Sequence, residues 1–129
     1  MTELLVIGLN HKTASIDVRE RLAFPEGGIE RALSRVKSFP SLKENMILST
    51  CNRVEIYAAA RETEKAIHDL KEFFSQYHAI SLKEFEKSLY THVGEEAVRH
   101  IFRVASSLDS MVVGEPQPAR YSAQGRSPF

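Results

Sequence analysis

The sequence predicts one α+β domain, in which an antiparallel four-stranded sheet carries packed helices as an α/β sandwich of the ferredoxin-like type. Three observations support this prediction. The chain has 129 residues, the length of one ordinary domain. Short apolar runs typical of strands alternate with segments whose apolar residues recur at helical spacing. No long internal repeat is present, and the simplest arrangement places the helices on one face of the sheet.

The first strand is predicted at residues 3–9, where a short apolar run precedes turn-prone residues. Ser15 can cap a short helix that ends near Leu22. A second helix is predicted between Pro25 and Pro40, because proline ends a helix. Its apolar positions at helical spacing are Ile29, Ala32, Leu33 and Val36.

Two further strands are predicted at residues 46–48 and 54–58, joined by a reversal at residues 49–53. The polar side chains of the joining segment, which include an asparagine that tolerates left-handed backbone, suit a tight turn. This hairpin places the single cysteine of the chain, Cys51, near its tip.

The second half of the chain adds a long helix at residues 62–79, a short strand at residues 89–92 and a helix at residues 95–108. Acidic residues in the first turn of the last helix favour its start, because they complement the helix dipole. The final segment, residues 118–129, has no apolar periodicity. We therefore expect a domain at residues 1–117 and a non-native or disordered tail after it.

Composition excludes several classes of protein. The 17 basic and 17 acidic residues cancel, so net charge does not indicate a dedicated nucleic-acid binder. No apolar run approaches the roughly 18 residues of a membrane span. The N-terminus lacks the basic start and cleavage site of a secretory signal, so we expect a cytoplasmic location. One cysteine excludes an internal disulfide and a multi-cysteine metal site, and no metal is expected.

Cys51 is the first candidate for chemistry. A lone cysteine is commonly a small buried apolar residue, but a reversal is an unusual place for one. Arg53, two residues on, can share a face with the thiol, and a nearby cation favours the nucleophilic thiolate. Arg53 can also bind a substrate carboxylate bidentately, or pair on the surface with Glu55.

His100 is the second candidate. It could polarise a carbonyl or shuttle a proton, but spacing alone favours an ordinary ion pair with Glu96, one helical turn earlier. The segment at residues 106–117 is rich in hydrogen-bonding groups, either as a ligand-binding loop or as a solvated connector. No glycine-rich strand-to-helix turn follows any predicted strand, so we expect no nucleotide cofactor site in this chain.

Three segments together resemble one family. Residues 8–14 with Arg19 and Glu20 are similar to the opening of that family. Residues 49–57 are similar to its nucleophile motif, and residues 104–117 to its active-site loop. The three segments occur in order over residues 4–117, which makes the resemblance specific, and the family is the glutamyl-tRNA reductases.

The resemblance implies an NADPH-dependent reductase of tetrapyrrole (porphyrin) biosynthesis. The Cys51 thiolate would attack the ester of glutamyl-tRNA and form a thioester, which NADPH bound by another domain would reduce to glutamate-1-semialdehyde. His100 matches a histidine important for activity. By the same resemblance, the glutamate site would comprise Thr50, Asn52, Arg53, Ser110, Glu115, Pro116 and Gln117.

The chain departs from the family after Gln117. Pro118 to Tyr121 stand where the family continues into a long helix, and the NADPH and dimerisation domains are expected to be missing. In the complete enzyme, the resemblance implies a homodimer and a partner in glutamate-1-semialdehyde aminomutase. The alternative to an enzyme fragment is a non-catalytic α+β module that binds an acidic metabolite or RNA through Arg53.

Overall fold

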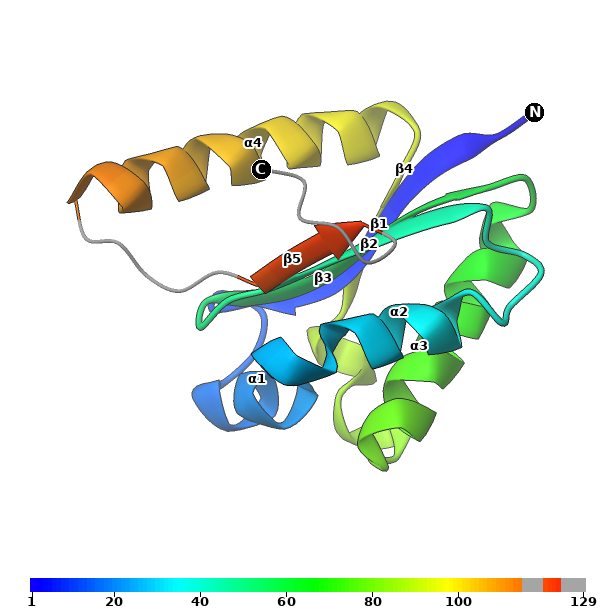
Figure 1. Cartoon of the computed structure of the whole chain (residues 1–129), viewed down its shortest axis with the longest axis horizontal. Coiled ribbons are helices and arrows are strands. Elements are labelled where there is room, and N and C mark those ends of the chain that lie inside the picture. Colours follow the sequence, from blue (N-terminus) through cyan, green and yellow to red (C-terminus); the bar gives the residue numbers. More distant parts are fainter. Residues whose placement is uncertain (115–119, 124–129) are drawn as a thin grey trace.

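A computed structural model describes the backbone of residues 1–114 and 120–123, and the side chains of residues 1–107. Within these residues, one sheet has the strand order β4-β1-β3-β2-β5, and every pair of neighbours is antiparallel. The predicted α+β class and antiparallel sheet are therefore confirmed (Figure 1). The strands are β1 (Glu3–Asn10), β2 (Glu44–Ser49), β3 (Arg53–Ala60), β4 (Tyr90–Val93) and β5 (Arg120–Ala123).

The first three helices begin and end close to the predicted positions, but the last helix continues to Gly114, past its predicted end at residue 108 and into the segment that was expected to be a loop. Ser15 caps the first of them, since its Oγ accepts a hydrogen bond of 3.3 Å from the Val18 N–H. Short 3₁₀ turns lie at Glu26–Gly28, Leu82–Glu84 and Glu86–Ser88. The α-helices are α1 (Ile16–Leu22), α2 (Ile29–Val36), α3 (Thr63–His78) and α4 (Glu95–Gly114).

The helices cover both faces of the sheet. Figure 1 shows α1, α2 and α3 on one side and α4 on the other. The expectation of helices on one face was wrong for α4. Alternation along β1 and β3 accounts for the difference, because consecutive residues of a strand point to opposite faces and both sets are buried here.

The face under α1, α2 and α3 holds the main apolar core. Phe24 lies at its centre, with ring centroids 6.0 Å from Phe73 and 6.1 Å from Phe74. These rings are fully buried or nearly so. Alternate residues of the central strands complete the core: Leu5, Ile7, Leu9, Val54, Ile56, Ala58 and Ala60.

The face under α4 has a smaller apolar cluster at one end of the sheet. It contains Val6, Leu48, Tyr57, Ala97 and Val104. The other end of this face is polar, because the next residues along the strands are Glu55 and Arg53 on β3 and Asn10 on β1. The α4 face therefore combines an apolar anchor with a polar site.

One strand lies in the segment for which we expected no regular structure. Arg120–Ala123 forms β5 and pairs with β2 from Met46 to Ser49. Four strands were predicted, and the sheet has this strand as a fifth. Without β5, the edge of β2 would present unpaired backbone groups. Among the described residues, no helix is both long and apolar enough to cross a membrane.

Candidate active site beneath the last helix

Glu55 is at the centre of the polar end of the α4 face. It is fully buried, and its cross-strand neighbours are Leu48 on β2 and Gly8 on β1. Gly8 is itself paired with Tyr90 on β4. A Cβ atom at Gly8 would lie 2.3 Å from the Val54 carbonyl oxygen and 2.9 Å from the Glu55 Cα, so the sheet requires glycine here. Because Gly8 has no side chain, the Tyr90 side chain can reach Glu55 across β1.

Four side chains donate hydrogen bonds to the Glu55 carboxylate. Tyr57 donates its hydroxyl to Oε1, and Tyr90 donates its hydroxyl to Oε2. Oε2 also accepts from Nε2 of His100 and, at 3.3 Å, from a guanidinium nitrogen of Arg53. Because an ionised carboxylate only accepts, the Nε2 atom of His100 carries a proton.

The pKa values in this cluster favour an ionised Glu55 between neutral tyrosines. Burial alone would raise the pKa of Glu55, but hydrogen bonds from His100, Tyr57 and Tyr90 lower it below its usual value. Burial and the neighbouring carboxylate raise the pKa of both Tyr57 and Tyr90 far above its usual value. Glu55 therefore acts as a fixed negative charge that orients its four donors.

His100 projects from α4 toward the sheet. It is 6% exposed, and its ring stacks on His92 with centroids 4.5 Å apart. The alternative interpretation of His100 as the partner of Glu96 is wrong, because Glu96 pairs instead with Arg99 at 3.1 Å. Since Glu55 holds Nε2, the atom of His100 that remains for a ligand is Nδ1.

Arg53 makes the ion pair that was the alternative to a ligand-binding role. Its side chain is 13% exposed, and the guanidinium nitrogen that pairs with Glu55 is one of three. Arg53 also lines a cavity, so its remaining N–H groups can bind a ligand there.

This cavity has a volume of about 520 Å³, within the usual range for ligand sites. The loop after β1, the start of β3, strand β4 and the middle of α4 enclose it. Arg53, Tyr90 and His100 connect it to the buried carboxylate below. Its described lining residues are Asn10, His11, Lys12, Arg53, Tyr90, His92, His100, Arg103, Val104 and Ser107.

Cys51 lies in the turn between β2 and β3 and is exposed. The Thr50 side chain shapes this turn, since its Oγ1 accepts hydrogen bonds of 3.1 Å from the N–H groups of Asn52 and Arg53. Arg19 on α1 supports the turn from outside by donating from Nε to the Cys51 carbonyl at 3.3 Å. Cys51 is not among the lining residues of the cavity, but Arg53, two residues on, is.

The structure places the predicted site residues unequally. Thr50, Cys51 and Asn52 form the turn between β2 and β3, and both Arg53 and His100 line the cavity. Ser110 lies within α4, but its side chain is outside the described residues, as are Glu115, Pro116 and Gln117 entirely. Within the described residues, no group of three or more histidine, cysteine or acidic side chains could hold a metal ion.

Sequence reasoning missed the central role of Glu55 and assigned nothing to Tyr57, Tyr90 and His92. One signal was available: Glu55 interrupts an otherwise apolar strand, and a carboxylate there requires partners if both faces are covered. Tyr90 and His92 alternate on β4, which places them on one face. Nothing in the sequence indicated that this face lies under α4.

Comparison with known proteins gives one consistent result. Residues 7–119 match the family model described as "Glutamyl-tRNAGlu reductase, N-terminal domain". The chain is 53% identical over 114 residues to a glutamyl-tRNA reductase of Geotalea uraniireducens, and 51% identical to one of Citrifermentans bemidjiense. Each alignment covers 88% of this chain and 26% of the relative. This chain thus spans about a quarter of their length.

A solved structure gives the same result at the level of the fold. The glutamyl-tRNA reductase from Methanopyrus kandleri aligns with a TM-score of 0.61 and 34% sequence identity. The alignment covers 87% of this chain and 24% of that one.

Proposed function

Since the chain belongs to the glutamyl-tRNA reductase N-terminal domain family, we propose that it forms the glutamate site and supplies the nucleophile of a glutamyl-tRNA reductase. The observation that carries the proposal is the position of the exposed Cys51 thiol, two residues from a guanidinium that lines a cavity. Residues 1–117 form the proposed domain. The proposed location is the cytoplasm.

The proposed reaction is an acyl transfer to Cys51. The thiolate attacks the carbonyl carbon of the ester that joins glutamate to the terminal ribose, and a carbon–sulfur bond forms. The carbon–oxygen bond to the ribose then breaks, and the ribose oxygen leaves with a proton as the free hydroxyl of tRNA. The products are a glutamyl thioester on Cys51 and uncharged tRNA.

Arg53 is the proposed ligand of the glutamate side-chain carboxylate. Glu55 holds one guanidinium nitrogen at 3.3 Å, which fixes the plane of the guanidinium while its other N–H groups remain for the substrate. A partly buried arginine can bind a carboxylate bidentately, whereas the side-chain amide of glutamine has one accepting oxygen and would turn its NH2 group toward the cationic guanidinium. The proposal therefore predicts selection of glutamate over glutamine.

His100 is the proposed second catalytic residue. The Glu55 carboxylate fixes its ring through Nε2, so Nδ1 would accept or donate the proton of the reaction or polarise the ester carbonyl. Thr50 and Asn52 would hold the turn that presents the thiol. We also propose that Ser110, Glu115, Pro116 and Gln117 complete the glutamate site.

NADPH, which this family implies, does not fit the described residues. A Rossmann-type dinucleotide site uses parallel strands and a glycine-rich turn into a helix, whereas every strand pair described here is antiparallel. We therefore derive no step through NADPH in this chain. We assign reduction of the thioester to glutamate-1-semialdehyde, the homodimer and contact with an aminomutase to the complete enzyme.

Incubation with glutamyl-tRNA tests the proposal. We expect tRNA release and the mass of one glutamyl group on Cys51 by intact-mass spectrometry, with or without NADPH. Cys51→Ser should greatly weaken acylation while circular dichroism shows an unchanged fold.

Two results would contradict these expectations. NADPH oxidation by the 129-residue chain alone would disprove the assignment of reduction to other residues. An unacylated thiol that iodoacetamide alkylates no faster than a cysteine in an unfolded peptide, with no protection by glutamyl-tRNA, would favour a non-catalytic binding module.

A further inference from the structure

Two exposed cations lie at the outer part of the cavity. Lys12 is on the loop that follows β1, and Arg103 is on α4, three residues after His100. Both line the cavity. Within residues 1–107, where side chains are described, neither makes an ion pair with a carboxylate.

The described lining of the cavity carries a net positive charge. It contains three fixed cations, Lys12, Arg53 and Arg103, and no aspartate or glutamate. Glu55 lies below it and already accepts hydrogen bonds from four donors. Burial is the main cause that lowers the pKa of His92, and the charges of His100 and Arg103 lower it further, in agreement with a positively charged lining. A ligand of this cavity should therefore be an anion.

The glutamyl group alone does not balance these charges. At neutral pH it brings one side-chain carboxylate, which Arg53 would bind, and one ammonium group. Lys12 and Arg103 then have no anionic partner in the amino acid. The other anions of the proposed substrate are its phosphodiesters, and the nearest is separated from the ester by a single ribose.

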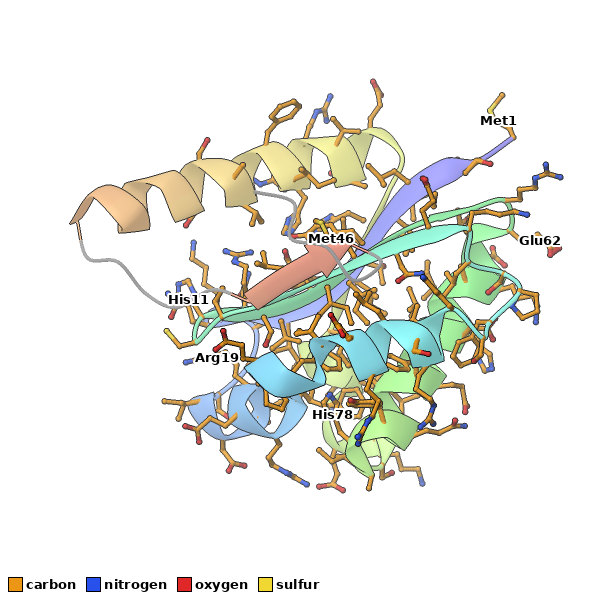
Figure 2. All side chains as sticks on the ribbon, in the orientation of Figure 1. Met1, His11, Arg19, Met46, Glu62 and His78 are labelled. Carbon is orange, nitrogen blue, oxygen red and sulfur yellow. The ribbon has the colours of Figure 1, made fainter. Side chains whose placement is uncertain are left out.

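The strand register places Lys12 close to the turn that carries the nucleophile. Asn10 and Arg53 are the last cross-strand pair between β1 and β3. Beyond this pair, Lys12 is two residues along one strand and Cys51 is two residues along the other, in neighbouring loops. Figure 2 shows His11, which precedes Lys12, at the same end of the sheet as Arg19, whose Nε binds the Cys51 carbonyl.

We propose that Lys12 and Arg103 bind the phosphate on the 5′ side of the terminal nucleotide of glutamyl-tRNA, so that the ester lies between this phosphate site and Arg53. The assignment rests on the proposed function. The two cations fix one end of the substrate and Arg53 fixes the other, which orients the carbonyl toward Cys51.

Two small esters test this assignment. One is glutamate esterified to the ribose of adenosine, and the other is the same ester on adenosine 5′-monophosphate. For the wild-type chain, the phosphate should raise the rate constant of Cys51 acylation roughly tenfold. Lys12→Gln and Arg103→Gln should each reduce the ratio of the two rate constants about threefold, whereas Lys83→Gln, an exposed lysine outside the cavity lining, should not change it.

A binding measurement separates the phosphate site from the reaction. A trinucleotide with the sequence of the tRNA 3′ end, carrying no amino acid, is titrated at several salt concentrations. Each of the two substitutions in the site should reduce the slope of log affinity against log salt by roughly 0.7.

Each outcome decides between the two proposals. If Cys51 is acylated equally well by both esters, or if the double variant keeps the wild-type ratio, the phosphate site is wrong and the proposed function stands. If neither ester acylates Cys51 but trinucleotide binding still depends on Lys12 and Arg103, the function is wrong and the phosphate site stands. Trinucleotide binding that neither substitution weakens overturns the phosphate site.

Discussion

The two faces of the sheet differ in what they bury. The face under α1, α2 and α3 buries aromatic and aliphatic side chains, with the phenylalanines packed at its centre. The face under α4 buries an ionised carboxylate, a histidine and two tyrosine hydroxyls beside a small apolar cluster. A buried charged network contributes little net stability, because desolvation offsets its attraction, but it orients its members strongly. The difference indicates that one face stabilises the domain while the other positions the site.

The largest expected effect is on the apolar face. Phe74 is fully buried against Phe24 and Phe85, so Phe74→Ala should lower the free energy of unfolding by about 3–5 kcal/mol. Phe102→Ala is the matched control, because Phe102 is 68% exposed and should change stability little. Urea denaturation measures both. Equal losses for the two variants would mean that the apolar face does not dominate stability.

The next effect is on chemistry. Arg53→Ala leaves the substrate carboxylate unpaired and should cost about 2–5 kcal/mol of transition-state stabilisation, a loss of roughly 30-fold or more in acylation. The preference for glutamyl-tRNA over glutaminyl-tRNA should disappear at the same time. Arg61→Ala, an exposed arginine just beyond the other end of β3, is the control. Equal acylation of the wild-type chain by both aminoacyl-tRNAs would remove Arg53 from this role.

The third prediction concerns the carboxylate that connects the two roles. Glu55→Gln replaces one accepting oxygen by an amide that donates, so at least one of the four donors loses its acceptor. We expect a loss of about 1–3 kcal/mol in stability and slower Cys51 acylation. Thermal unfolding and single-turnover acylation measure the two effects. Wild-type acylation in a folded Glu55→Gln chain would show that the carboxylate does not position the site.

The sequence predicted the local elements well and the α4 face poorly. Helix caps, apolar periodicity and the turn at Cys51 are local signals, so the hairpin and the helix that begins after Ser15 could be found. Whether Glu55 is buried depends on α4, which is about 40 residues later in the chain and on the face that we expected to be open. Arg53 shows the same limit: spacing suggested either a ligand or a Glu55 pair, and the structure shows the Glu55 pair in a residue that also lines the cavity.

The smallest expected effect is a pH dependence of stability that arises from a histidine on the apolar face. His78 ends α3 on the apolar face, where its ring lies 4.8 Å from that of Phe24 and its buried Nε2 has no hydrogen-bond partner among the described residues. Burial lowers the pKa of His78 from 6.5 to about 4, although a hydrogen bond to the Leu22 carbonyl opposes the shift. The unfolded chain therefore takes up a proton between pH 6.5 and pH 4 that the folded chain does not. Stability from this residue is fully present above pH 6.5 and is lost as the pH falls toward 4.

The partial exposure of the His78 ring reduces this loss to about 1–2 kcal/mol. His78→Gln should remove it, so the difference in unfolding free energy between wild type and variant should shrink or reverse from pH 7 to pH 4.5. Burial also lowers the pKa of His92, but His92 is present in both proteins, so its contribution cancels in the difference between wild type and variant. The pKa of Glu55 is lowered as well, and its contribution is lost only below pH 4.5. His68→Gln, an exposed histidine on the same helix, is the control. A pH-independent difference between wild type and His78→Gln would show that His78 is protonated as readily in the folded chain as in the unfolded one.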